Sequence, residues 1–121
     1  MISFPRTGAE SPVTYHLSPI TYYQGMDFSF SEDQLAIRAA IEKVCERFDA
    51  AYWLKKDTEG GFPDDFHQAF ARDGWLGIAM PEAYGGAGLG ITEAAIMLQA
   101  ISESGAGMSG ASAVHMNIFS L

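Results

Sequence analysis

The chain has 121 residues, 48% of them hydrophobic, and a formal net charge of −8. This length favours one domain with a buried core. The negative charge disfavours binding to nucleic acid or anionic lipid, because Lys and Arg must neutralise the phosphates of both. No apolar run is long enough to span a bilayer, and a single cysteine, Cys45, excludes an internal disulfide. The composition suits the reducing cytoplasm, where we expect this protein to reside.

The charges are unevenly distributed along the chain. From Gly74 to the last residue there is no Lys or Arg, and the only acidic residues are Glu82, Glu93 and Glu103. A stretch so apolar is expected to be covered by another surface. The first half of the chain is short for that task, so we expect the second half to pack on a further partner or domain.

Residues 1–25 contain Pro5, Pro12 and Pro19 and follow neither a helical nor a strand period. This pattern predicts an irregular N-terminal arm. Met26 opens a segment of different character. The arm is therefore either a genuine mobile extension or an artefact of start-site choice.

A long amphipathic helix is predicted over residues 32–51. Ser31 is a good N-cap, and Gln34 three residues later completes a capping box. Apolar side chains then recur at helical spacing. A polar loop is predicted over 55–62, followed by a short helix over 63–73, whose first turn contains Pro63.

Two more helices are predicted in the second half, over 92–104 and 111–121, with Gly105, Gly107 and Gly110 breaking the chain between them. No segment has a convincing strand pattern. The expected fold class is therefore all-α, a small bundle of about four helices.

The glycine-rich loop 81–90 is the most informative segment. A glycine loop ahead of a helix can cradle phosphate, but a dinucleotide site needs a preceding strand and is often supported by a basic residue. Neither is evident, so we favour a loop that lets helices and a neighbouring domain approach closely. No metal-ligand set or activated nucleophile stands out, and Glu82, Glu93 and Glu103 are interpreted as capping or solvated carboxylates.

The order of these motifs resembles the N-terminal domain of the acyl-CoA dehydrogenase family. The segment FSFSEDQ (28–34) opens a helix, and Phe62-Pro63 opens another. The specific part is GWLGIAMPEAYGGAGLG (74–90), followed by a helix that ends Ser102-Glu103-Ser104-Gly105. The resemblance covers residues 26–121.

The resemblance implies a flavoenzyme with three parts: this helical domain, a middle β domain and a C-terminal helical bundle. In such enzymes FAD is held mainly by the later parts and by a neighbouring subunit. A later carboxylate removes the α proton of the acyl-CoA, and hydride passes from the β carbon to the flavin. We therefore expect this chain to be an incomplete N-terminal domain. It contributes no catalytic or cofactor-binding residue, and alone it neither turns over substrate nor binds FAD.

The resemblance also implies partners and sites. The full enzyme would act on acyl-CoA, pass electrons to an electron-transfer flavoprotein and form a homo-oligomer. The last helix of this domain lines the far end of the acyl-chain pocket in the family. The positions implied here are Ala111, Ser112, His115, Met116 and Phe119. The interdomain loop would comprise Pro81, Glu82, Tyr84, Gly85 and Gly86.

Three hypotheses about function remain open from the sequence. The first is a piece of an acyl-CoA dehydrogenase. The second is a piece of a relative with altered chemistry, such as an acyl-CoA oxidase or a flavin monooxygenase. The third is a non-catalytic helical module that binds a partner through its apolar C-terminal half.

Overall fold

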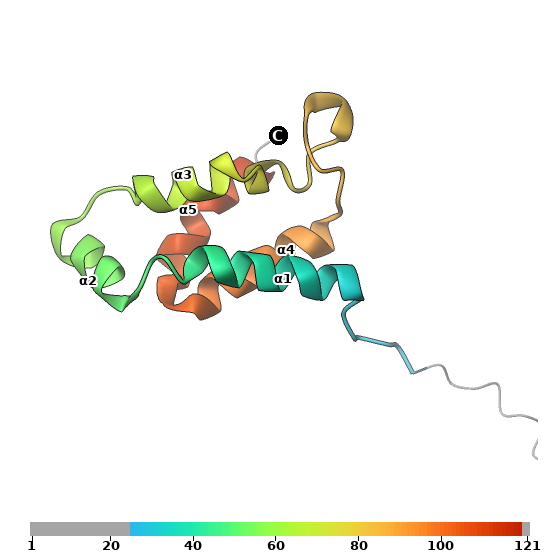
Figure 1. The fold of residues 1–121 in the computed structure, drawn as a ribbon, viewed down its shortest axis with the longest axis horizontal. Helices are drawn as coiled ribbons and strands as arrows, with labels where there is room; N and C mark the ends of the chain where they lie inside the picture. Colours follow the sequence, from blue (N-terminus) through green and yellow to red (C-terminus); the bar gives the residue numbers. More distant parts are fainter. Residues whose placement is uncertain (1–24, 120–121) are drawn as a thin grey trace, which may run out of the picture.

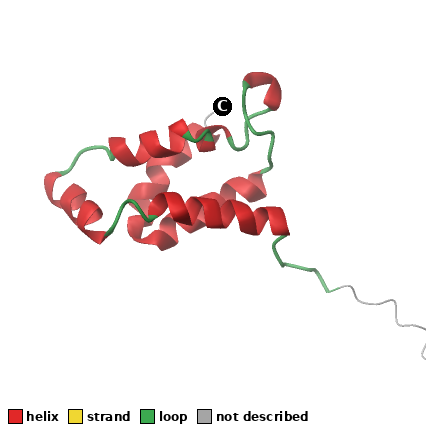
Figure 2. Cartoon of the chain, in the orientation of Figure 1, coloured by secondary structure: helices red, strands yellow, loops and turns green. Residues whose placement is uncertain are grey.

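The computed structural model describes residues 25–119, and these are helical with no strand among them (Figures 1 and 2). The α-helices are α1 (Glu32–Cys45), α2 (Ala50–Glu59), α3 (Asp64–Arg72), α4 (Ile91–Ile101) and α5 (Gly107–Phe119). Two 3₁₀ turns, η1 (Trp75–Gly77) and η2 (Glu82–Tyr84), precede α4, and a π-helical turn (Ser102–Ala106) joins α4 to α5. The all-α fold class is confirmed. The predicted irregular arm lies outside the described residues except for Gly25.

The capping box predicted at the start of α1 is confirmed. The Ser31 hydroxyl accepts the Gln34 N–H at 3.2 Å, and the Ser31 N–H donates to the Gln34 side chain at 3.0 Å. The predicted end of this helix at residue 51 is wrong, because α1 stops at Cys45. The chain turns at Asp49. Its backbone is extended, and its side chain caps the start of a new helix.

The sequence prediction missed most of α2. Asp49 Oδ1 accepts the Tyr52 N–H at 2.9 Å and thereby caps α2. The predicted loop over 55–62 is therefore helical as far as Glu59. It ends at Gly60 and Gly61, whose φ angles of 73° and 90° suit glycine. Prediction and structure agree better for α3, whose buried stripe contains Phe66, Ala69 and Phe70.

The break between the last two helices is shorter than predicted. Regular α4 ends at Ile101 rather than 104, and α5 begins at Gly107 rather than 111. Gly105 does break the helix, with a φ of 97°, but Gly110 lies within α5. A Cβ atom at Gly110 would lie 2.4 Å from Ala106 Cβ and 3.2 Å from Trp53 Cη2. Gly110 therefore lets α5 approach Trp53 closely.

One hydrophobic core unites these elements. Helices α1 and α4 lie side by side, and α5 packs against both α4 and α3 (Figure 1). Helices α1 and α4 begin at the same end of the molecule, where Gln34 Nε2 donates to Glu93 Oε1 at 2.8 Å. The most deeply buried large side chains are Ile41, Phe66, Phe70, Ile78, Met97, Ile101 and Val114. Each such side chain stabilises the fold by about 1.5–3 kcal/mol.

Candidate functional site

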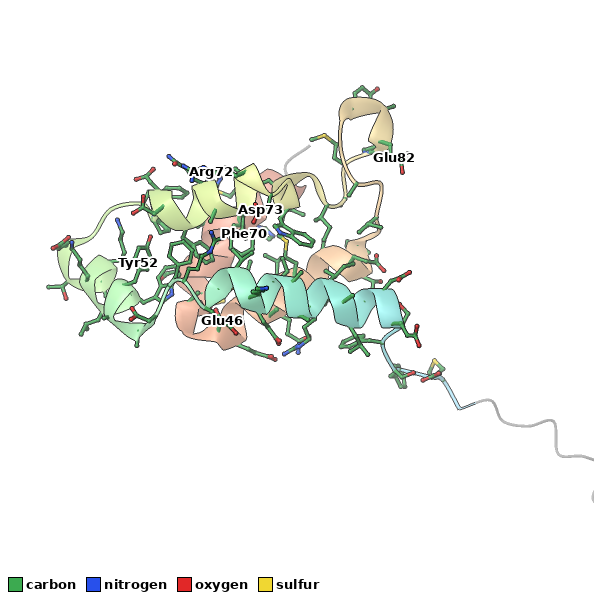
Figure 3. All side chains as sticks on the ribbon, viewed as in Figure 1. Glu46, Tyr52, Phe70, Arg72, Asp73 and Glu82 are labelled. Atoms are coloured by element: carbon green, nitrogen blue, oxygen red, sulfur yellow. The ribbon has the colours of Figure 1, made fainter. Side chains whose placement is uncertain are left out.

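The glycine-rich loop forms a compact turn that projects from the helical body and carries Glu82 (Figure 3). Its backbone is bonded to the segment before it. The Ala87 N–H donates to Gly77 O at 3.0 Å, the Gly88 N–H to Met80 O at 2.8 Å, and the Leu89 N–H to Ile78 O at 3.0 Å. The loop therefore has a defined, hydrogen-bonded conformation.

Two glycines in this loop have different physical reasons to be glycine. Gly85 has a φ of 84°, which a side chain disfavours. At Gly86 the reason is contact, because a Cβ atom there would lie 2.0 Å from the carbonyl oxygen of Met80. Non-bonded heavy atoms do not approach that closely, so only glycine fits without a movement of the backbone.

The five residues predicted to form an interdomain loop lie together in this turn. Pro81, Glu82, Tyr84 and Gly85 are exposed, and Gly86 is half-buried beneath them. Tyr84 retains 80% of its accessible surface. The turn therefore exposes the Tyr84 ring and the Glu82 carboxylate on a backbone that is held by hydrogen bonds.

The positive end of α4, directly after this loop, is occupied by a side chain of the same helix. Glu93 Oε2 accepts the Gly90 N–H at 2.9 Å, while Glu93 Oε1 accepts from Gln34. The Gln34 hydrogen bond is the main reason that the pKa of Glu93 lies below its ordinary value. A phosphate would have to displace this carboxylate, and the loop holds no Lys or Arg to compensate.

Four of the five predicted acyl-pocket residues have described side chains, and these differ in burial. Ala111 is buried among the domain's own core residues. Ser112, His115 and Met116 are exposed, with His115 one turn after Ala111 at the edge of the buried side. Phe119 ends α5, and its side chain lies outside the described residues. Met108, two turns before Met116, joins the exposed set, and the two methionines keep 78% and 71% of their accessible surface. We call Met108, Ser112, His115 and Met116 the α5 face.

Two hollows of this surface are lined by residues outside both the loop and the α5 face. A groove of about 770 Å³ runs along α1 to the end of α3, lined by Lys43, Arg47, Asp73 and Trp75 among others. A smaller hollow of about 420 Å³ adjoins Cys45 and Glu103. Burial raises the pKa of the Cys45 thiol, as expected for a structural cysteine.

The sequence resemblance was tested by comparison with known proteins. A family profile described as "Acyl-CoA dehydrogenase, N-terminal domain" matches residues 31–121. The chain belongs to the acyl-CoA dehydrogenase family. No solved structure matches at a comparable level of significance.

Curated members of the acyl-CoA dehydrogenase family resemble this chain over part of their length. The "Probable acyl-CoA dehydrogenase YdiO" of Escherichia coli K12 is 32% identical over 82 residues, which are 67% of this chain and 21% of that protein. "Acyl-CoA dehydrogenase fadE12" of Mycobacterium tuberculosis is 27% identical over 68% of this chain and 22% of its own length. "Benzylmalonyl-CoA dehydrogenase" of Aromatoleum aromaticum is 27% identical over 74% and 24%, respectively. The matched part of this acyl-CoA dehydrogenase-family chain spans about a fifth of the length of these relatives.

Sequence reasoning missed one polar network in this family member. Arg38 on α1 bonds Glu103 in the π-helical turn and also bonds Glu42 through Nε at 2.9 Å. Of the three late carboxylates, Glu93 and Glu103 make side-chain hydrogen bonds within the fold, while Glu82 and Glu103 are both exposed. In the described part of the chain no helix is long and apolar enough to cross a membrane. No group of three His, Cys, Asp or Glu side chains there could hold a metal ion.

Proposed function

We propose that residues 26–121 are the N-terminal helical domain of an FAD-dependent enzyme that oxidises the CH–CH bond of acyl-CoA thioesters in acyl-CoA breakdown. The observation that carries the proposal is the family profile's match over residues 31–121. The relatives described above are named dehydrogenases. Their names favour dehydrogenation over the oxidase or monooxygenase chemistry that the sequence left open.

In this proposal the α5 face borders the far end of the acyl tail. Its support is the exposed Met108 and Met116, on a helix with no charged residue. Methionine suits an apolar ligand of variable shape because its side chain is flexible and polarizable. His115 and Phe119 would limit the length of the tail, and Ser112 would lie beside them. Ala111 would act from the buried side by keeping α5 close to the core.

The interdomain loop would be the second contact region of the proposed enzyme. Pro81, Glu82, Tyr84 and Gly85 are exposed in the turn that projects from the body, and the backbone of this turn is hydrogen-bonded to the segment before it. An exposed aromatic ring on an ordered loop suits a contact that buries it without ordering a flexible segment. We propose that this turn packs against the middle domain of the enzyme.

The described residues do not fit a flavin site. The α4 N-terminus is closed by Glu93, and the hollows on α1 are lined by residues outside the proposed acyl-tail face. We therefore assign FAD no contact within residues 25–119, and we expect the 121-residue chain alone neither to retain FAD nor to turn over substrate. The proposed enzyme is a cytoplasmic homo-oligomer that passes electrons to an electron-transfer flavoprotein.

The test uses the protein made from the complete reading frame of the gene. It is purified with FAD and mixed with saturated acyl-CoAs of short, medium and long chain. Reduction of an artificial electron acceptor that depends on acyl-CoA supports a dehydrogenase. Oxygen consumption that forms peroxide at a similar rate points to an oxidase. Absence of both flavin and turnover contradicts the proposal and favours a non-catalytic module.

The acyl-tail role of α5 is tested by Met116→Ala in the same protein. The substitution makes room at the α5 face, so the preferred acyl chain should lengthen. Each additional methylene accommodated contributes about 0.8 kcal/mol, or roughly fourfold in kcat/KM. Leu54→Ala on α2 is the matched control, because Leu54 is comparably exposed and lies on another helix. An unchanged length profile in Met116→Ala contradicts this role.

A further inference from the structure

The backbone between α4 and α5 departs from regular helical geometry at two glycines. Gly105 has a φ of 97°, and Gly107 at the start of α5 has a φ of 55°. Glycine tolerates such angles at little cost, and it also tolerates many others. Backbone geometry alone therefore does not fix the direction in which α5 leaves α4, and contacts between side chains must do so.

Glu103 provides the charged contact in this turn. One carboxylate oxygen, Oε2, bonds Arg38 Nη2 on α1, and the other, Oε1, accepts from Gln99 Nε2 of α4 at 2.9 Å. A single carboxylate thus connects the turn to α1 and to α4. The pKa of Glu103 is lowered, chiefly by the hydrogen bond from Arg38, so the carboxylate is ionised at neutral pH.

Arg38 is the cation available for this contact. The chain has no Lys or Arg after Arg72, so α4, the turn and α5 cannot supply one. Arg38 is three-quarters buried at its side chain and also bonds Glu42 one turn later on α1. Its planar fork can hold two carboxylates at once, which a lysine does less well.

We infer that Arg38 and Glu103 are a positioning pair that sets the direction of α5 and thereby the place of the α5 face. The pair adds to the core packing of α5 by joining the turn to α1, beside Gly105 and Gly107. Its consequence for acyl-chain selection rests on the proposed function, but its effect on α5 does not.

Trp53 gives a direct readout of α5. This side chain on α2 is buried, and a Cβ atom at Gly110 of α5 would lie only 3.2 Å from its ring. A change in the direction of α5 alters this packing and the environment of the indole. Trp75 in η1 would obscure the signal because η1 also contacts α5. The measurements therefore use a Trp75→Phe background.

The experiment is a double-mutant cycle of Arg38→Met and Glu103→Gln on the 121-residue chain. Hydrogen exchange of the α5 amides and Trp53 fluorescence are measured for each variant. Each single substitution should speed α5 exchange by about two- to fivefold, as for a partly exposed ion pair, and the double variant should match the singles rather than add to them. Exchange in α1 and α3 should change far less.

Two controls separate positioning from a general loss of stability. Lys43→Met removes a cation from the same helix, and Glu42→Gln removes the other carboxylate that Arg38 bonds. Both should leave α5 exchange and Trp53 fluorescence as in the parent chain. Unchanged α5 exchange in Arg38→Met, or equal acceleration in every helix, would overturn the inference.

The complete enzyme distinguishes this inference from the proposed function. Arg38→Met should weaken discrimination between acyl chain lengths through KM more than through kcat. If α5 exchange responds in the chain while the length profile of the enzyme does not, the positioning pair stands and the acyl-tail role of the α5 face is contradicted.

Discussion

Gly86 has the tightest backbone contact in the glycine loop, facing the carbonyl oxygen of Met80. We expect Gly86→Ala to lower the free energy of unfolding by about 1–3 kcal/mol, because the added methyl group forces the two backbone segments apart. Urea denaturation followed by far-UV circular dichroism measures the change. The matched control is Gly25→Ala, since nothing lies within 4 Å of a Cβ atom there. Equal stability of the two variants would contradict the close approach.

Glu93 gives the fold a specific dependence on pH. Its pKa is lowered in the folded state, mainly by Gln34. A carboxyl with a lowered pKa stabilises the fold above its unfolded pKa, and this contribution is lost as the pH falls through the folded pKa. Glu93→Gln keeps an oxygen that can accept the Gly90 N–H but removes the titration.

We therefore expect the stability of the parent chain to fall more steeply than that of Glu93→Gln between about pH 5 and pH 3. Urea denaturation across this range provides the comparison. The other carboxylates with lowered pKa values, Asp27 and Glu103, titrate in both proteins and cancel in the difference. Parallel stability curves would show that Glu93 acts only through its shape.

Among the elements, α2 depends most clearly on one capping residue. Asp49 Oδ1 accepts the Tyr52 N–H, and α2 carries Trp53 into the core. Asp49→Ala should cost about 1 kcal/mol of stability. Asp57→Ala is the control, because it makes the same chemical change inside the same helix, where alanine is favoured. Thermal unfolding of both variants tests this, and a larger loss in Asp57→Ala would contradict the capping role.

The sequence predicted those helices whose caps and buried stripes depend only on residues close together in the chain. The capping box at Ser31 and the buried stripe of α3 required only neighbouring residues. The division at Asp49 was missed because apolar residues continue on both sides of it. Gly110 was misread as a breaker because its reason lies in Trp53, far away in sequence. Tertiary packing overrides local propensity at such positions.

The same distinction applies to the candidate site. The loop residues Pro81–Gly86 are contiguous, so the sequence alone could place them together. Which side of α5 is exposed depends on how the helix packs. Ala111 is consequently buried, whereas Ser112, His115 and Met116 are exposed. The Arg38–Glu103 contact joins residues 65 positions apart. A single sequence holds no pattern that pairs such distant charges.

The molecule as a whole has large apolar side chains on its surface, with Met108 and Met116 two turns apart on α5. We expect the 121-residue chain to self-associate through the α5 face. A double substitution of both methionines by Gln should weaken association at least about tenfold, because burying one such side chain contributes about 1.5–3 kcal/mol. Sedimentation velocity over a range of concentrations measures it.

Leu54→Gln serves as the control for this prediction. Leu54 is 68% exposed but lies on α2, away from the α5 face. Its substitution should leave the association unchanged. If Leu54→Gln dissolves the assembly and the methionine substitutions do not, the contact surface lies on α2 instead.

The absence of Lys and Arg after Arg72 has a consequence for anyone who handles this protein. Trypsin cleaves after these two residues, so it leaves the glycine loop, α4, the π-helical turn and α5 in one long peptide. A tryptic map therefore resolves changes in α1 to α3 and leaves the proposed acyl-tail helix in a single unresolved fragment. A protease that cleaves after glutamate has three sites in this fragment: Glu82 in the exposed turn, and Glu93 and Glu103, whose side chains form hydrogen bonds within the fold.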